Sequence, residues 1–418
     1  MLTIGDSAFQ GCASLTEVKV PKSLKEFGGA TTGSGTNQTV TSSIFNACTS
    51  LTTIDLSATQ VTQLPANLFQ GCTSLSNVKL PSGLTSIGQQ AFQDTTSLKT
   101  IEIPSSVTTI NGSAFADSGL TTIDLSQTAI TQIDNAVFQN TASLTDVKLP
   151  TRITSIGTRA FFNSGITALD LSTTALTTIN QGAFANTTNL KSLTVPNSLT
   201  TINSGDNQTS NSTTTYNATF TGSGLTTLDL SQTTITSIAT STFNGATKLE
   251  TVKLPSSVTT INANAFQGTT ALKTLTQEAP AQTPSETPAP GRATGTNQLA
   301  STLKKIDTRA FQGTGLESID LSQTQITGSG DNALGNSAFQ DAASLSDVKL
   351  PNGLTTIPAA SFAGTTALKS IDIPKTVNRI NAGNNDFPGA FQGSGLESID
   401  LSGTKMVIGG GSDNSGNS

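Results

Sequence analysis

The sequence predicts an elongated α/β repeat solenoid, in which short units of chain stack one on another. Three observations predict it: a phenylalanine that recurs every 23 or 24 residues apart from insertions, a pattern of apolar residues repeated around it, and a composition unlike that of ordinary globular proteins. A fixed period of this length is typical of solenoids, whose units cannot close a core alone. The recurrent residues are Phe9, Phe45, Phe69, Phe92, Phe115, Phe138, Phe161, Phe184, Phe220, Phe243, Phe266, Phe311, Phe339, Phe362 and Phe391.

Each unit has apolar residues at fixed positions, counted from its first leucine. In the unit from Leu98 to Phe115 these are positions 1, 4, 6, 10, 13 and 18. Positions 4 and 6 flank one polar residue, which is the period of a strand with one buried face. Proline follows position 6 in eight units and serine in six others, and we call these Pro units and Ser units. Proline suits a strand end because it lacks an N–H. Ser units gain one residue before the phenylalanine and lose one after it, ending in Ser-Gly-Leu, so we expect the register between coils to be kept.

Stacking of about 15 units of 23 residues predicts the layout of core and sheet. Positions 4 and 6 should form one long parallel β-sheet along one side, because each unit must pack its apolar side chains on its neighbours. The columns of Ile, Leu and Phe should form a continuous core. The segment around each phenylalanine, often Ala-Phe followed by polar residues, should form short helical or irregular turns on the opposite side.

The repeated pattern is specific enough to resemble a known family. It reads Leu-x-x-Ile-x-Ile-Pro-x-x-Val-x-x-Ile-x-x-x-Ala-Phe-x-x-Cys/Thr-x-x-Leu and is similar to the BspA-like leucine-rich repeat of surface proteins from host-associated bacteria and parasitic protists, over about Leu2 to Ile408. The resemblance implies a curved solenoid that adheres to extracellular-matrix proteins such as fibronectin and fibrinogen, or to other cells. The asparagine ladder of other leucine-rich repeats is missing, and the family's cysteine occurs only in the first three units.

Composition excludes several functional classes. Histidine is absent, which removes the most frequent general base and metal ligand near neutral pH, so we expect no catalytic residue, cofactor or metal. The net charge of -6 argues against nucleic acid as a partner, because such binding depends on clustered lysine and arginine. No apolar run approaches the roughly 20 residues of a membrane helix. The chain is therefore predicted to be a non-enzymatic protein without a membrane span.

Four loop insertions interrupt the period, and all are expected between position 13 and the phenylalanine. They should emerge from one edge of the stack, where loops on a rigid scaffold commonly carry recognition. Tyr216, the single tyrosine, is the candidate loop contact. Neutral drift of surface loops is the alternative, because none carries an aromatic cluster. The insertions cover residues 28–40, 203–219, 327–337 and 381–388.

A single solenoid is expected over residues 1–408. A Pro-rich insertion at about 278–298 should be extended and disordered. It interrupts one unit, because Leu303, Ile306 and Phe311 resume the core pattern after it. Residues 409–418, rich in glycine and serine, are expected to form a flexible tail.

The polar residue at position 5 faces outward and forms a column of mixed charge. Neighbours in this column lie one strand apart, so opposite charges should face each other across the ladder, each pair contributing about 0.2–1 kcal/mol. Two interpretations stay open: the alternation fixes the stacking register and blocks wrong pairings, or the column binds a mixed-charge protein surface. The candidate contact residues are Lys79, Glu102, Asp124, Lys148, Asp170, Asp229 and Lys253.

Cysteine and threonine form two further columns. Cys12, Cys48 and Cys72 each follow their phenylalanine by three residues and are expected to be buried free thiols. Threonine suits extended structure because its branched side chain is stiff, and this explains the second column. A remote alternative is that the threonine column binds an ordered surface such as ice. The threonines are Thr62, Thr85, Thr108, Thr131, Thr154, Thr177, Thr200, Thr236 and Thr259.

The leading hypothesis is a secreted or cell-surface scaffold that binds an extracellular or cell-surface protein. Its alternative is a structural element of a fibre or surface layer. Both ends of the array lack an obvious polar cap, which leaves self-association by end-to-end stacking open.

Overall fold

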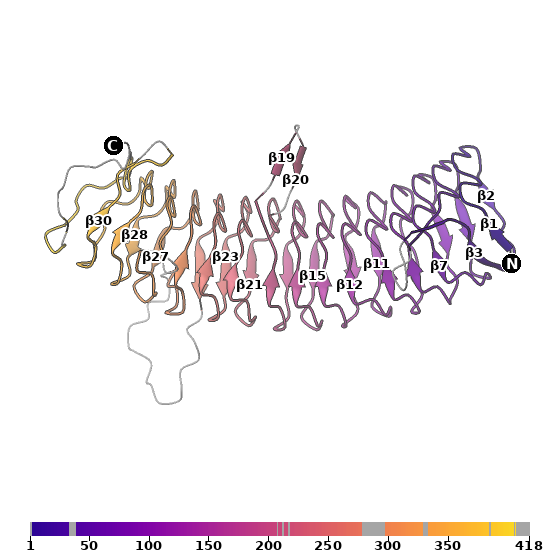
Figure 1. Cartoon of the computed structure of the whole chain (residues 1–418), viewed down its shortest axis with the longest axis horizontal. Coiled ribbons are helices and arrows are strands. Elements are labelled where there is room, and N and C mark those ends of the chain that lie inside the picture. Colours follow the sequence, from indigo (N-terminus) through magenta and orange to yellow (C-terminus); the bar gives the residue numbers. More distant parts are fainter. Residues whose placement is uncertain are drawn as a thin grey trace, which may run out of the picture.

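The computed structural model is an elongated, gently curved stack of coils (Figure 1). It describes residues 2–32, 39–206, 208–210, 213–215, 218–277, 297–328, 333–383, 386–404 and 406. All secondary-structure elements within these ranges are strands, so the turns around the phenylalanines are irregular rather than helical. In the same ranges no helix is long and apolar enough to cross a membrane. The predicted repeat solenoid is confirmed.

Most coils contribute two short strands, which form two parallel ladders where one long sheet was predicted. The first ladder contains positions 3 to 5 of the units. It is interrupted, and its sheets have the orders β2-β6-β8, β11-β13, β15-β17, β21-β23-β25 and β27-β28. Its strands are β2 (Glu17–Val18), β6 (Thr53–Asp55), β8 (Asn77–Lys79), β11 (Thr122–Asp124), β13 (Asp146–Lys148), β15 (Ala168–Asp170), β17 (Ser192–Thr194), β21 (Thr227–Asp229), β23 (Thr251–Leu254), β25 (Thr274–Gln277), β27 (Ser318–Asp320) and β28 (Asp347–Lys349).

The second ladder is built around position 13 and holds the outward threonine column beside it. Thr108, for example, donates from both its N–H and its hydroxyl to the Thr85 carbonyl of the preceding coil, at 2.8 and 3.1 Å. Its strands are β1 (Leu2–Ile4), β3 (Leu24–Phe27), β7 (Gln63–Leu64), β9 (Ser86–Ile87), β10 (Thr109–Ile110), β12 (Gln132–Ile133), β14 (Ser155–Ile156), β16 (Thr178–Ile179), β18 (Thr201–Ile202), β22 (Ser237–Ile238), β24 (Thr260–Ile261), β26 (Lys305–Ile306), β29 (Thr356–Ile357) and β30 (Arg379–Ile380).

The phenylalanine column forms the spine of the core. The fifteen rings stack in fourteen consecutive pairs, with centroids 5.0–6.0 Å apart and planes within 2–24° of parallel. Rings this far apart are offset, which is a favourable arrangement for aromatic pairs. Twelve of them are almost fully buried. The single sequence rule that located these residues is therefore confirmed.

Most phenylalanine turns have left-handed backbone on both sides of the ring. Around Phe92 the residues with positive φ are Gln90 (57°) and Asp94 (60°), two positions before and two after. Most coils repeat this pair, and the later position holds Gly, Asn or Asp in all but one of them. These residue types adopt the left-handed region at least cost. The turns are joined between coils by backbone hydrogen bonds, as from Phe92 N to Ala114 O at 2.8 Å.

Ser units and Pro units differ in how the strand ends. In the Ser unit around Leu125, the Thr128 hydroxyl donates to the Leu125 carbonyl at 2.7 Å, and both residues are buried. In five of the eight Pro units the residue at position 6, such as Ile103, is only partly buried. We predicted that a Ser unit is one residue shorter after its own phenylalanine. Instead, the shortened Ser-Gly segment follows the phenylalanine of the preceding unit and comes before the Ser unit begins.

The loop insertions differ in position. Three follow position 13, as predicted, and two of these contain antiparallel hairpins, of which β19–β20 projects from the stack in Figure 1. The prediction for residues 327–337 is wrong, because Leu334 bridges to Ile306 and therefore occupies position 13 itself. The extra residues there enter before position 13. The hairpin strands are β4 (Ala30–Thr32) with β5 (Thr39–Thr41), and β19 (Gln208–Ser210) with β20 (Thr213–Thr215).

Some predicted features lie outside the described residues. These are Tyr216, the Pro-rich insertion apart from Asn297 and Gln298, and the tail at 409–418. The core on either side of the insertion is described, and Leu303, Ile306 and Phe311 are fully buried, as predicted. The division of the chain into solenoid and tail stays a prediction.

The cysteine column follows the prediction in two of three coils. Cys48 and Cys72 are buried, and their thiols donate to the carbonyls of Phe9 and Phe45 in the preceding coils, at 3.1 and 3.0 Å. Burial raises the pKa of the Cys72 thiol to about 12. Cys12, in the first described coil, is exposed, contrary to prediction.

Candidate interaction face

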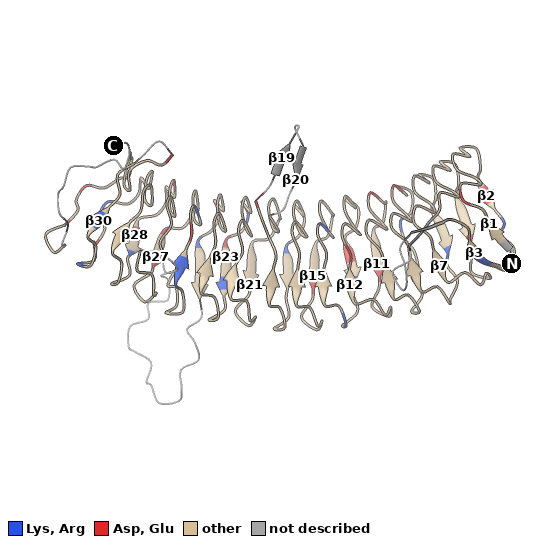
Figure 2. Cartoon of the chain, in the orientation of Figure 1, with Lys and Arg blue, Asp and Glu red and all other residues tan. Residues whose placement is uncertain are grey.

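The outward residues of the first ladder form one continuous surface, which we call the ladder face. All seven candidate contact residues are exposed there. The structure places Asp124 opposite Lys148, Asp170 opposite Thr194 and Asp229 opposite Lys253, in the register expected. Glu102 lies in a coil that the ladder skips, between β8 and β11. Charged residues of both signs are scattered along the coils rather than gathered into one patch (Figure 2).

Four ion pairs on the ladder face join a Ser unit to the Pro unit that follows it. At four such junctions the Ser-unit aspartate meets the Pro-unit lysine, and the strands of the two coils are hydrogen-bonded as well. The pairs are Asp55–Lys79 at 3.6 Å, Asp124–Lys148 at 3.8 Å, Asp229–Lys253 at 3.0 Å and Asp320–Lys349 at 3.4 Å. The predicted charge pairing is thus confirmed at these junctions.

The aspartates also have a local role that sequence reasoning missed. Asp124 Oδ1 accepts a hydrogen bond from Ser126 N at 2.9 Å, while Oδ2 faces Lys148. Hydrogen bonds from the Ser126 hydroxyl and N–H, with a smaller contribution from Lys148, lower the pKa of Asp124. The recurring Asp-Leu-Ser triplet was the available signal, because aspartate commonly bonds to the backbone two residues on.

Exposure keeps three of these pairs weak, while in the fourth the Asp320 side chain is only 8% exposed. In the Asp124–Lys148 pair the side chains remain 56% and 62% exposed. Exposed ion pairs contribute about 0–1 kcal/mol and are screened by salt. Either partner can therefore turn to another charged surface at little cost. Chemically, the ladder face presents cations and anions at fixed spacing on a rigid stack.

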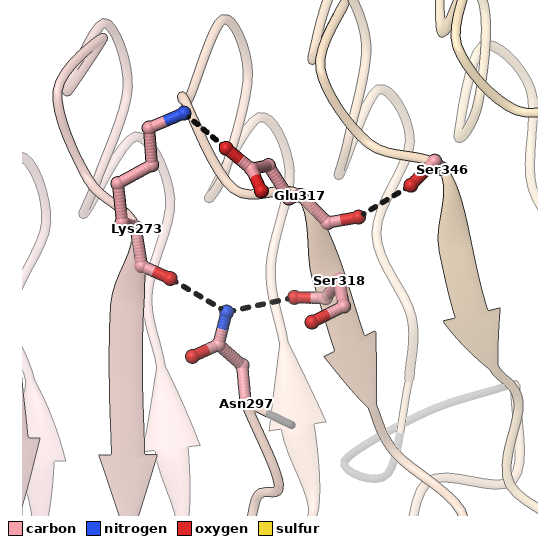
Figure 3. Close-up of polar contacts among 5 residues, drawn as sticks. All are labelled: Lys273, Asn297, Glu317, Ser318 and Ser346. Carbon is pink, nitrogen blue, oxygen red and sulfur yellow. Dashed lines mark hydrogen bonds and ion pairs between the residues drawn. The ribbon is translucent and has the colours of Figure 1, made fainter. Parts of the chain in front are cut away.

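A second charged column, at position 2, was also missed. Lys273 Nζ pairs with Glu317 at 2.6 Å and Lys369 Nζ with Glu397 at 3.2 Å. In other coils threonine or serine hydroxyls at this position donate to the preceding coil, as does Ser346 to the Glu317 carbonyl at 3.1 Å (Figure 3). The signal was present in the residue after each unit's first leucine.

The chain returns from the Pro-rich insertion between β25 and β27, where Gln298 forms an isolated parallel bridge to Asp320. Asn297 is 5% exposed, and its amide donates to the carbonyls of Lys273 and Ser318, both at 2.9 Å, as Figure 3 shows. Its Oδ1 accepts from Leu275 N at 2.9 Å. The side chain therefore supplies the hydrogen bonds that a neighbouring strand would otherwise make between β25 and β27.

Gln277, the last residue of β25, lies where the chain enters the insertion. It stands at the apolar position 6, is 2% exposed, and donates to the Val258 carbonyl at 2.7 Å while accepting from Ala300 N at 3.0 Å. A buried amide is tolerated because these bonds replace those lost to water. Together with Asn297 it keeps the two ends of the insertion in the coil, so the ladder face continues past it.

Within the described ranges no three Cys, Asp or Glu side chains gather in a way that could hold a metal ion. The acidic neighbours Asp372 and Asp400 form a parallel bridge through their backbones, without a third ligand. What the ladder face can do chemically is pair with charges on another molecule.

A known repeat family matches nearly the whole chain. The family description BspA type Leucine rich repeat region matches residues 1–121, 113–211, 206–285, 295–387 and 332–412, which is nearly the whole chain. The chain belongs to the BspA-type leucine-rich-repeat family. No curated protein matches it.

Several solved structures resemble this BspA-type chain. A leucine-rich-repeat protein from Bacteroides ovatus is 21% identical with a TM-score of 0.59, covering 83% of this chain and 86% of its own. A leucine-rich cell-surface protein from Faecalibacterium prausnitzii is 21% identical (TM-score 0.38, coverage 88% and 79%). A leucine-rich-repeat protein from Eubacterium ventriosum is 22% identical (TM-score 0.43, coverage 81% and 90%). At such identity the likeness to the first shows the fold alone.

Proposed function

We propose that this chain is a non-catalytic adhesion scaffold, secreted or held at the cell surface, which binds an extracellular protein through its ladder face. The observation that carries the proposal is the column of exposed charges that the stack holds in register. The contact residues are Lys79, Glu102, Asp124, Lys148, Asp170, Asp229 and Lys253.

The regular spacing of exposed charges makes the ladder face suitable for binding an extended protein surface. Coils repeat about every 4.8 Å, so a partner with charges on an extended surface can meet several of these residues at once. Because the stack is rigid, little side-chain or backbone entropy is lost on binding. Charge complementarity of this kind gives specificity and fast association more than raw affinity. The partner class is a mixed-charge protein surface, with matrix proteins as the first candidates.

A binding panel tests the proposal. Wild-type protein and a variant carrying Lys79→Glu, Lys148→Glu and Lys253→Glu are compared on immobilised fibronectin, fibrinogen and other matrix proteins, and on cells. We expect the variant to bind at least about tenfold more weakly, the equivalent of about 1.4 kcal/mol. Lysines are chosen because, unlike the aspartates, they make no bond within the strand-end turn.

A matched control changes the same charge elsewhere. Lys25→Glu, Lys248→Glu and Lys304→Glu alter three exposed lysines that lie off the ladder face. This variant should bind as the wild type does. Equal losses in the two variants would mean that net charge, not the ladder face, governs binding. Failure of the wild type to bind any member of the panel would refute the adhesion proposal.

A further inference from the structure

Strand pairing in the first ladder stops at three junctions in the middle of the stack, each where a Pro unit is followed by a Ser unit. Within the described part of residues 98–277, no strand pairing joins β11, β15 or β21 to the coil before it. We call these the open junctions. The apolar residue at position 6 of the Pro unit is only partly buried at each, namely Ile103, Leu149 and Val195. Where a second Pro unit follows instead, as after Leu80, that residue is buried.

A fourth junction, between β25 and the Ser unit of β27, is filled by a segment of the chain itself. The segment is Asn297–Leu299, which follows the Pro-rich insertion. Asp320 N donates to the Asn297 carbonyl at 2.9 Å, and Leu299 N donates to the Asp320 carbonyl at 3.0 Å. On the other side, Leu275 N donates to Asn297 Oδ1 at 2.9 Å. The segment therefore bonds to both strands that flank it.

This segment covers groups that the open junctions leave exposed. Gln277, at position 6 before it, is 2% exposed, and Leu299 is fully buried. The Asp320 side chain is 8% exposed, whereas that of Asp124, in the Ser unit of an open junction, is 56% exposed. An extended segment thus fits between two coils on the ladder face, held by main-chain bonds, one asparagine side chain and one leucine.

The stack takes in this segment without opening on its other sides. Phe311 stacks on Phe266 at 5.2 Å and on Phe339 at 5.3 Å, as in the other coils. Only the ladder face widens, by about one strand spacing of 4.8 Å. At the open junction of β13 and β15, the backbone bond beside the strands is a long one, from Thr167 N to Thr145 O at 3.4 Å. Little pairing therefore has to be exchanged there for bonds to another chain.

We propose that the open junctions bind extended segments of a partner protein, each inserted as an added strand in the way that Asn297–Leu299 is. Addition of a strand at an unpaired sheet edge is a recurring mode of peptide recognition, in which main-chain bonds give affinity and side chains give specificity. The segment that fits has an asparagine followed two residues later by a leucine.

The junction of β13 and β15 shows which groups make the contacts. By position in the unit, Val147 corresponds to Leu275, and Asp170 corresponds to Asp320. The amide oxygen of the partner's asparagine then accepts from Val147 N, and its main-chain carbonyl accepts from Asp170 N. The partner's leucine covers Leu149. These contacts are independent of the charge pairing proposed for the ladder face, because they use main-chain groups and one apolar side chain.

A peptide titration tests the proposal. The probe is the synthetic peptide Thr-Asn-Gln-Leu-Ala-Ser-Thr, the sequence of residues 296–302, carrying a fluorophore and titrated with the full chain. We expect saturable binding in fluorescence anisotropy. The same peptide with Asn297→Ala and Leu299→Ala should bind at least about tenfold more weakly. Equal binding of the two peptides, or binding of neither, would overturn the proposal whatever the matrix-protein panel shows.

Hydrogen exchange locates the bound peptide. Exchange should slow in residues 99–125, 145–171 and 191–230, one range for each open junction. In Leu149→Lys the new ammonium group can reach water in the free chain but is covered by a bound segment. This variant should lose the protection in residues 145–171 and keep it at the other two junctions, which serve as its control. Circular dichroism checks its fold, and the comparison of the two peptides does not depend on it. Protection of residues 145–171 that the variant leaves unchanged would contradict the assigned site.

Discussion

Replacing Gly165 with alanine tests whether the shortened Ser-Gly segment needs glycine because it packs closely against the backbone of the preceding coil. Gly165 stands in the Ser-Gly segment after Phe161 and donates its N–H to the Thr141 carbonyl at 3.1 Å. A Cβ on Gly165 would lie 2.1 Å from the Ala142 carbonyl oxygen and 2.9 Å from its carbon. Both are backbone atoms, so the coils themselves would have to part by more than an ångström.

The cost can be worked from these contacts. Forcing an extra carbon into a packed site costs about 1–3 kcal/mol, and loss of the Gly165 hydrogen bond about 0.5–1.5 kcal/mol. We expect Gly165→Ala to lower the free energy of unfolding by roughly 2–4 kcal/mol. Urea unfolding followed by circular dichroism measures it, and hydrogen exchange across residues 141–166 localises it, because repeat proteins can open locally.

Gly83 supplies the matched control. A Cβ there meets no atom within 4 Å, and its φ is not positive. Gly83→Ala should therefore change stability by less than about 0.5 kcal/mol or increase it slightly. If Gly165→Ala were as harmless as Gly83→Ala, the explanation of the Ser-Gly segment would be wrong.

Three other predictions follow from burial and charge. Phe161→Ala should lower the free energy of unfolding, measured in urea, by about 3–5 kcal/mol, since the Phe161 ring is fully buried between two other rings. Phe9→Ala should lower it clearly less, since Phe9 is 36% exposed and stacks on one ring. Equal losses in the two variants would contradict the stacked core. A thiol reagent near neutral pH should label the exposed Cys12 at once. It should label Cys72, whose burial raises its pKa to about 12, only when the protein unfolds, and rapid labelling of Cys72 would contradict that burial. Burial, and then the neighbouring Asp117, raise the pKa of Asp94, so the charged form of Asp94 opposes folding. Asp94→Asn should therefore raise the free energy of unfolding by up to about 1 kcal/mol near neutral pH. If the variant were equally stabilised in acid, where Asp94 is protonated, this explanation would be wrong.

The regular columns made most of the core predictable from sequence. One phenylalanine rule located the stacked spine, and the spacing of apolar residues located the strands of the first ladder. The insertion at 327–337 was misplaced because no apolar residue marks position 13 until Leu334, which only the bridge to Ile306 identifies. The turn geometry was missed although its signal was present, since Gly, Asn and Asp recur two residues after the phenylalanines. Asn297 could not have been found, because its partners Lys273 and Ser318 come together only when the coils stack.

The two residue types in the charge column do not carry the same weight for function. An aspartate such as Asp124 or Asp229 closes the strand-end turn of its Ser unit through Oδ1, so the fold alone accounts for its presence. The Pro units impose no such demand, since the same position holds Lys148 in one and Thr194 in another. A lysine there adds only an exposed ion pair, worth about 0–1 kcal/mol. Replacing an aspartate therefore perturbs turn and surface together, whereas replacing a lysine changes the surface with little effect on the coil, and the lysines are where binding by the ladder face can be separated from folding.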